Sequence, residues 1–234
     1  MAWLKRLSAP IAKERKSRGK FIVCPRGPHK KAASLPLLVA LRDKIMLVGS
    51  LKEGKGAIKR GEMLIDCKVC RDEKFGAGLF DTVSVPSASA FYRIVPEKAG
   101  GLKLLKISEK ESKIKICKII GKTSVSGGKI QYNLHDGRNL ISGEKYNAGD
   151  SLIIGLPGQK VIEHLKFEKE NTGFITTGKN AGMVAKLEKI EAGRTRRVWM
   201  KKEGGIGTAG SAFEAPMNYV IIIGKEKPAI AVSE

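Results

Sequence analysis

Cys67 and Cys70 have the spacing of a metal-binding pair. A structural zinc site takes four ligands, usually from two such pairs, but the remaining cysteines, Cys24 and Cys117, stand alone in the sequence. A thioredoxin-like redox pair lies at the start of a helix, whereas Cys67 and Cys70 fall in or beside a predicted strand. The two thiols are therefore interpreted as small apolar side chains, and neither a metal ion nor another cofactor is expected.

Acid–base chemistry has one candidate, the neighbouring residues His135 and Asp136. No nucleophile accompanies them, and the sequence has no Gly-x-Ser-x-Gly elbow, Gly-x4-Gly-Lys-Ser/Thr loop or His-Glu-x-x-His motif. The run Leu-His-Asp-Gly-Arg at 134–138 is more typical of a tight turn between strands. We therefore predict that the protein is not an enzyme and has no small-molecule substrate.

The strongest signal is charge, because 44 lysines and arginines against 23 acidic residues give a formal net charge of +21 and a pI near 9.9. Such an excess repels itself in a compact state, and a polyanion relieves the repulsion. Nucleic acid is thus the expected partner. A membrane surface would require a basic amphipathic helix with large apolar anchors, which the sequence lacks. Without an apolar run of signal-peptide length near its start, the chain is expected to be cytoplasmic with reduced cysteines.

The first 35 residues are expected to form a basic arm. They hold ten lysines and arginines against one acid, Glu14, and too few apolar residues to fold alone. Contacts with RNA are predicted for nine of these cations: Lys5, Arg6, Arg15, Lys16, Arg18, Lys20, Arg26, Lys30 and Lys31.

A compact αβ unit is predicted to follow, from residue 36 to about 95. Apolar residues at near-helical spacing indicate a helix over 37–47, and a second helix covers 51–60, ending at Gly61. Gly54 and Gly56 weaken this second helix, because each glycine costs about 1 kcal/mol relative to alanine. A strand is predicted at 62–69, either with one continuous apolar face or with a turn near Asp66, and another at 81–85, where Pro86 ends the strand.

The second predicted helix carries a basic face. Its cations lie three or four residues apart and so share one side, and two further cations follow on the adjoining strand. Together they predict a patch that grips RNA phosphates, formed by Lys52, Lys55, Lys59, Arg60, Lys68 and Arg71. Aromatic residues are scarce, at 6% of the chain, so recognition of the backbone and shape of folded RNA is favoured over stacking of splayed bases.

The rest of the chain has the pattern of β-structure. Short apolar runs separated by turn residues predict a small barrel or sandwich over 91–158, a second β unit over 173–190 and a final strand at 219–223. Glycine turns, above all Thr-Gly-Lys-Asn-Ala-Gly at 177–182, allow amides and side chains to meet phosphate. Exposed cations predicted to contact RNA in this half are Lys129, Arg138, Lys179, Arg194, Arg196 and Arg197.

Four sequence segments, in the right order, carry a resemblance to a known family. They are Leu4-Lys5-Arg6-Leu7 with Ala9-Pro10; Gly27-Pro28-His29 followed by Leu35-Pro36-Leu37-Leu38-Val39 and Leu41-Arg42-Asp43; Gly127-Gly128-Lys129-Ile130-Gln131 with Asn133-Leu134-His135-Asp136-Gly137-Arg138-Asn139; and Val220-Ile221-Ile222-Ile223-Gly224-Lys225. Along nearly its whole length the chain resembles the archaeal and eukaryotic small-subunit ribosomal protein family S-four-e, and the archaeal type is favoured.

The resemblance implies a multidomain α+β architecture of four parts. A basic N-terminal arm (1–35) is followed by an S-four-like αβ RNA-binding module (36–95), whose signature hairpin spans 60–69. A central β domain (96–160) and a KOW/SH3-like β barrel with the C-terminal strand (161–234) complete the chain. The sequence departs from the family pattern at Cys67 and at Ala185, where glycines are expected.

The function implied by the resemblance is that of a structural constituent of the small ribosomal subunit. The chain would bind ribosomal RNA through phosphate contacts and lie beside neighbouring ribosomal proteins, without a membrane partner. The alternative from a different class is a free RNA-binding assembly or transcription factor with a KOW-like module. An RNA-modifying enzyme would need a catalytic domain, and no segment remains to hold one.

Overall fold

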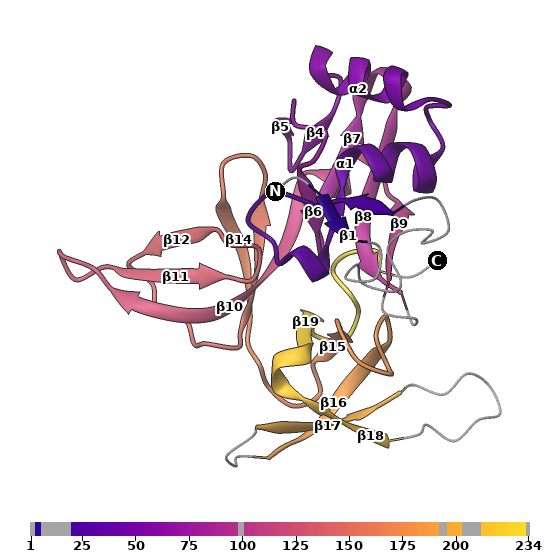
Figure 1. Cartoon of the computed structure of the whole chain (residues 1–234). Helices are drawn as coiled ribbons and strands as arrows, with labels where there is room; N and C mark the ends of the chain where they lie inside the picture. Colours follow the sequence, from indigo (N-terminus) through magenta and orange to yellow (C-terminus); the bar gives the residue numbers. More distant parts are fainter. Residues whose placement is uncertain (1–2, 6–19, 98–100, 192–195, 203–211, 233–234) are drawn as a thin grey trace. The chain divides into compact units, whose positions relative to one another are not determined.

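The computed structural model describes residues 3–5, 20–97, 101–191, 196–202 and 212–232 (Figure 1). The fold is mostly β-structure with a few helices. It divides into two compact units. The described residues up to Lys115, together with 156–158, form the first unit, and those of 116–155 and 159–232 form the second. Within the described residues, no helix is long and apolar enough to cross a membrane.

The first unit is organised around a five-stranded antiparallel sheet with the strand order β5-β4-β7-β8-β9. Its strands are β4 (Leu64–Ile65), β5 (Lys68–Val69), β7 (Thr82–Val85), β8 (Ala90–Pro96) and β9 (Leu102–Lys106). The turn η5 (Pro86–Ala88) connects β7 to β8. Because β9 pairs along β8, the sheet continues past residue 95, where the sequence placed the end of the αβ unit.

The hairpin between β4 and β5 confirms the turn predicted near Asp66. Asp66 and Cys67 both have positive φ angles, of 50° and 61°, as in the tight turns that match the twist of a hairpin. Glycine adopts this conformation without a steric cost, so Cys67 holds a strained position.

Two helical segments pack beside this sheet, and both predicted helices are confirmed. The first is α1 (Leu37–Val39), which continues as the wider π-helical segment η4 (Ala40–Ile45). The second, α2 (Leu51–Arg60), begins at its cap Ser50 and ends at Gly61, which is left-handed with φ 82°. Gly54 has a packing role, because a Cβ there would lie 2.7 Å from Leu38 Cδ1.

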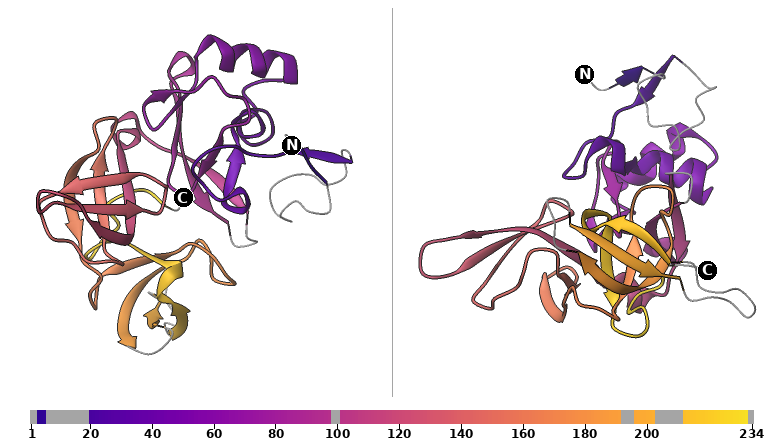
Figure 2. Two further views of the ribbon diagram at one scale, coloured as in Figure 1. Left: turned by 60° about the vertical axis from the view of Figure 1, so that its left-hand side comes forward. Right: turned by 90° about the horizontal axis from the view of Figure 1, so that it is seen from below.

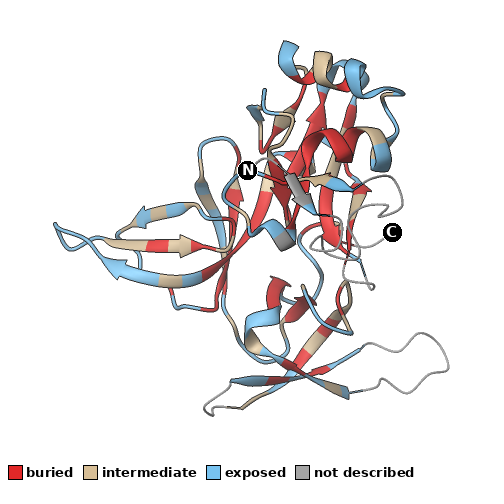
Figure 3. Cartoon of the chain, in the orientation of Figure 1, coloured by how far each residue is buried: buried red, intermediate tan, exposed pale blue. Residues whose placement is uncertain are grey.

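The core of the first unit lies between these helices and the sheet, and all three residues of α1 are buried (Figure 3). Leu37, Leu41, Ile58 and Ile94 are almost wholly buried there. Leu102 on β9 belongs to the same cluster. A short helix, α3 (Glu109–Ser112), follows β9 and was not predicted; its cap Ser108 accepts a hydrogen bond from the Glu111 amide.

Part of the expected basic arm is folded. β1 (Trp3–Lys5) pairs with β2 (Phe21–Val23), and β3 (Ser34–Pro36), which follows the turn η3 (Lys31–Ala33), pairs with β6 (Gly76–Gly78). Cys24 and Leu35 are buried. Residues 24–35 therefore bury apolar side chains against the αβ unit rather than among themselves, which agrees with the expectation that the first 35 residues do not fold alone. Residues 6–19 lie outside the described structure.

The second unit contains two five-stranded antiparallel sheets, seen from two more directions in Figure 2. In the first, with the order β12-β11-β10-β13-β14, the strands are β10 (Ile114–Ser124), β11 (Ile130–Leu134), β12 (Asn139–Ser142), β13 (Ser151–Gly155) and β14 (Lys160–Leu165). These strands lie within or beside the β region predicted at 91–158, and β12 and β14 consist largely of exposed or polar residues. Tyr132 and Leu152 lie in the core of this sheet.

The second sheet of this unit has the order β18-β17-β16-β15-β19. Its strands are β15 (Thr172–Ile175), β16 (Val184–Glu191), β17 (Arg197–Lys201), β18 (Ala212–Pro216) and β19 (Val220–Gly224), and the turn η6 (Met217–Tyr219) precedes β19. The predicted β unit and final strand are thus confirmed. They belong to one sheet, because β19 pairs with β15.

Candidate nucleic-acid interface

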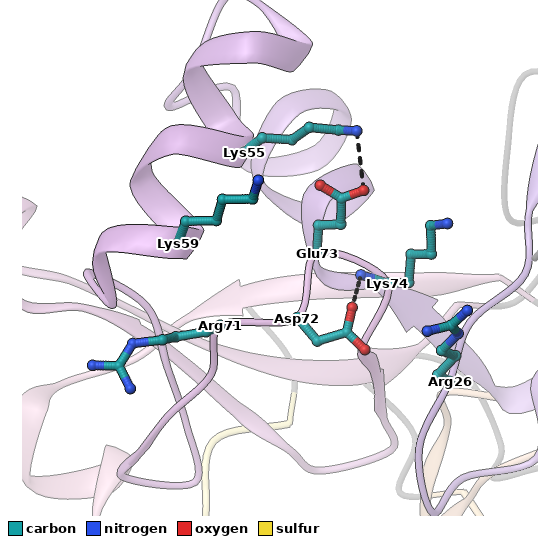
Figure 4. Close-up of a pocket in the computed structure, with 7 residues that line it drawn as sticks. All are labelled: Arg26, Lys55, Lys59, Arg71, Asp72, Glu73 and Lys74. Atoms are coloured by element: carbon teal, nitrogen blue, oxygen red, sulfur yellow. Dashed lines mark hydrogen bonds and ion pairs between the residues drawn. The ribbon is translucent and has the colours of Figure 1, made fainter.

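A basic pocket of roughly 310 Å³ opens on the first unit (Figure 4). Three stretches of chain line it: the segment after β2, the helix α2 and the loop between β5 and β6. Five of its side chains are cationic and two are acidic, which leaves a formal excess of three positive charges. The lining residues are Arg26, Lys55, Lys59, Arg71, Asp72, Glu73 and Lys74.

Backbone hydrogen bonds bring Arg26 to this pocket. Its amide donates to the Lys74 carbonyl over 2.8 Å, and its carbonyl accepts from the Gly76 amide over 2.6 Å. The two segments therefore run side by side, about fifty residues apart in sequence. Arg26, assigned to the arm from sequence, thus lies with the cations of the αβ unit.

The helix α2 supplies Lys55 and Lys59, which lie one turn apart on the side of the helix adjacent to the buried Gly54 and Ile58. Lys52 is exposed one turn earlier on the helix. Arg60 has a different orientation, because its Nε lies 2.6 Å from Glu62 Oε1, and hydrogen bonding to that carboxylate raises the pKa of the guanidinium. The predicted basic face is therefore present, but Arg60 is committed to a neighbour.

The two acidic residues of the pocket also have partners within the protein. Glu73 Oε1 lies 3.0 Å from Lys55 Nζ, and Asp72 Oδ1 accepts a hydrogen bond of 2.9 Å from the Lys74 amide. Arg26, Lys59 and Arg71 make no ion pair with any residue in the described part of the chain. Three cations are thus available to a ligand, and their charge suits a phosphate group.

The other predicted cations of the first unit are distributed outside the pocket. Lys5, Lys20, Lys30, Lys31 and Lys68 are exposed. Lys20 Nζ lies 5.8 Å from the centroid of the Phe21 ring. The predictions for Arg6, Arg15, Lys16 and Arg18, and for Arg194 in the second unit, concern positions outside the described residues.

In the second unit, Lys129, Lys179, Arg196 and Arg197 are exposed on turns or strands. The predicted turn around Lys179 is confirmed, because Gly178 and Gly182 have φ angles of 93° and 81°.

Arg138 was expected to be exposed, and this is wrong. Its side chain is about one-fifth exposed, and its Nε lies 3.4 Å from Asp136 Oδ2. Asp136 is buried and also accepts hydrogen bonds from the Arg138 amide and the Cys117 thiol. The buried carboxylate draws the guanidinium inward, so Arg138 holds the turn that was predicted at 134–138.

Sequence reasoning missed one cation of the pocket, Lys74, and its two acidic residues, although the charged run 71–74 directly after Cys70 was a usable signal. The sequence pattern also carried no sign that some cations are buried. Arg93, Lys115 and Lys118 are buried. Lys118 Nζ donates to the carbonyls of Met217 and Val220 over 2.7 and 2.6 Å, and burial lowers its pKa to about 8.

The cysteine pair has local hydrogen-bond partners. Cys67 Sγ lies 3.9 Å from the Ser112 carbonyl, and Cys70 Sγ lies 3.7 Å from the Asp72 carbonyl. Burial raises the pKa of both thiols, which favours the protonated form. Among the described residues, no group of three or more histidine, cysteine or acidic side chains is placed to hold a metal ion.

Small antiparallel sheets with a helix-lined cationic pocket define a class of β-rich, strongly basic proteins whose exposed charge suits a polyanion. The comparisons with known proteins are more specific. The family model "Ribosomal family S4e" matches residues 88–161. The chain is 36% identical over 207 residues to small ribosomal subunit protein eS4 of Methanothermobacter thermautotrophicus, covering 88% of this chain and 84% of that protein.

Two further matches extend along most of the chain. The eS4 protein of Methanocaldococcus jannaschii is 37% identical over 238 residues, which is 97% of this chain and 96% of that protein. The crystal structure of the 30S ribosomal protein S4e from Thermoplasma acidophilum matches with a TM-score of 0.70 and 26% identity, covering 86% of this chain and 98% of that one. The chain therefore belongs to the ribosomal protein S4e family, which confirms the resemblance noted from the sequence.

Proposed function

We propose that this chain is a structural component of the small ribosomal subunit, where it binds ribosomal RNA and lies beside neighbouring ribosomal proteins without catalysing a reaction. Its place in the cell would then be the cytoplasmic ribosome. The names of its relatives support the assignment to the small subunit. The observation that carries RNA binding is the pocket with Arg26, Lys59 and Arg71, whose charges are not paired within the described structure.

The proposed mode of binding is neutralisation of phosphates at several places on the protein. The pocket would hold one stretch of backbone, and exposed cations on the other turns would contact further stretches. Rigid small sheets would fix these RNA segments relative to one another. In domain terms, the αβ unit would act as the S-four-like module, β10–β14 as the central β domain and β15–β19 as the KOW-type barrel.

Two double variants with equal loss of charge test the pocket. Arg26→Ala with Lys59→Ala removes two unpaired pocket cations, and Lys106→Ala with Lys110→Ala removes two exposed cations of the same unit away from it. Affinity for small-subunit ribosomal RNA is measured by filter binding at several salt concentrations. Two lost phosphate contacts should weaken binding and reduce the slope of log K against log salt by about 1.5.

The control pair should change that slope much less. Equal losses in both variants would mean that the pocket has no special role and that only overall charge matters. Sedimentation of the native protein with small subunits in high salt distinguishes a structural component from a free assembly or transcription factor. A factor would be released, whereas a component would stay with the particle.

A further inference from the structure

Trp199 lies on the solvent side of the sheet β15–β19, although a tryptophan is costly to expose. Along β17 exposure alternates, so Val198 and Met200 are buried while Arg197, Trp199 and Lys201 share the outer face. The Trp199 side chain is 36% exposed. The inner face is already filled by Val198 and Met200, and the core therefore does not require this indole.

The strand register surrounds Trp199 with charged side chains. Lys189 on β16 is directly opposite it on one side, and Glu214 on β18 is opposite it on the other. Arg197 and Lys201 are two residues away along the strand, at a distance of roughly 7 Å each. The indole is thus an aromatic surface bordered by three cations and by Glu214.

Ion pairs hold part of this border in place. Lys189 Nζ lies 2.9 Å from Glu191 Oε1, and Arg197 lies 2.9 Å from Glu214 Oε1. Lys201 makes no ion pair with the described residues. Hydrogen bonds from Lys189 and then from the Trp199 indole lower the pKa of Glu191, so the ring is anchored by its edge. A ring held by its edge stays in place on the outer face, where Trp199 is partly exposed.

We propose that the outer face of β16–β18 around Trp199 binds an unpaired base of RNA by stacking on the indole. Lys201, which makes no ion pair with the described residues, contacts a phosphate that flanks the base. This inference rests on the proposed RNA-binding function and adds a second mode to it, because stacking requires an unpaired nucleotide whereas phosphate contacts do not. Stacking on the indole does not depend on the RNA sequence, since every base offers an aromatic face.

Fluorescence provides a direct test, because the chain has only two tryptophans, Trp3 and Trp199. In a Trp3→Phe variant all tryptophan emission comes from Trp199. An unpaired oligouridine should quench that emission, and a fully paired RNA hairpin of the same length should quench it much less. In the otherwise native chain, Trp199→Leu should weaken binding of the oligouridine by about 5- to 150-fold, which corresponds to 1–3 kcal/mol of stacking. Trp199→Phe should recover most of the loss.

The outcomes separate the two proposals. Tight, salt-dependent RNA binding with unchanged Trp199 emission and full affinity in Trp199→Leu would overturn the stacking site and leave the proposed function intact. Quenching that appears only in the assembled particle, with cross-links from position 199 to a protein, would also overturn it by assigning the face to a protein partner. Failure of the native chain to bind any RNA would refute the proposed function. Far-UV circular dichroism of each variant verifies that the sheet is folded.

Discussion

Lys115 is the cation whose removal should harm the first unit most. Its side chain is only 1% exposed, and its Nζ lies 2.8 Å from Asp66 Oδ2 and 2.5 Å from Asp81 Oδ1. Asp81 also lies 2.8 Å from His29 Nε2 and accepts a hydrogen bond from the Gly78 amide. Replacing Lys115 with methionine keeps much of the volume and leaves two carboxylates in one buried site.

The size of the effect follows from desolvation. Breaking a buried ion pair by removing one partner costs about 3–5 kcal/mol, which is a large part of the 5–15 kcal/mol that typically separates folded from unfolded domains. We therefore expect the free energy of unfolding of the first unit to fall by about 3–5 kcal/mol at pH 7.

The pH dependence has a definite sign. Burial would raise the pKa of Asp81, but the charges of Lys115 and His29 outweigh burial and hold that pKa far below its ordinary value of 3.8. The native chain thus has this stabilisation above about pH 4 and loses it as pH falls further. In Lys115→Met the penalty is already present at pH 7. The difference in unfolding free energy between the native chain and Lys115→Met should therefore become smaller at low pH.

Hydrogen exchange measured by mass spectrometry can locate the effect. Peptides covering β4, β7 and β8 should lose protection in Lys115→Met, while those of β15–β19 should not, and urea unfolding followed by circular dichroism gives the overall change. Lys113→Met is the matched control, because Lys113 is exposed and pairs only with Glu109 on the surface. A loss below about 1 kcal/mol, or one equal to the control, would refute the buried ionic site.

Three further predictions concern single substitutions. Gly54→Ala should destabilise the first unit by about 1–3 kcal/mol in urea unfolding, despite its better helix propensity, because the new Cβ would clash with Leu38; a gain in stability would mean that the contact relaxes freely. Cys67→Gly should raise the unfolding free energy by about 1 kcal/mol, because glycine relieves the left-handed turn; no change in midpoint would count against strain there. Burial lowers the pKa of Lys118 from 10.5 in the unfolded chain to about 8 in the folded one, so between these pH values the unfolded chain binds more protons. The free energy of unfolding of the native chain should therefore rise by about 3 kcal/mol from pH 8 to pH 10.5, relative to that of Lys118→Met. If the unfolding free energies of the native chain and of Lys118→Met changed equally with pH, this lowered pKa would be contradicted.

Local features of this protein were predictable from its sequence because their causes are local. The helix α2 follows from its capping residue, its apolar spacing and Gly61 at its end, and all three lie within a dozen residues. The strands with apolar alternation and the turns at Asp66 and Gly178 are local in the same way. The prediction of a polyanionic partner follows from the net charge of +21, which is the same however the chain folds.

The site could not be predicted so fully, because its parts meet through backbone hydrogen bonds. Arg26 joins Lys55 and Lys59 through pairing of its own segment with residues 74–76, and β19 joins β15 in the same manner. Every residue type except proline carries both the N–H and the C=O group, so side-chain patterns do not reveal the pairing.

Burial of charge is likewise a property of the assembled fold. In sequence, Lys115 and Lys118 are indistinguishable from exposed lysines. In the folded chain, partners distant in sequence hold each of them: Asp66 and Asp81 for the first, and the carbonyls of Met217 and Val220 for the second. Desolvation depends on what surrounds a group on all sides. Composition therefore reveals how much charge the chain carries, whereas long-range packing selects the cations that remain free to meet a phosphate.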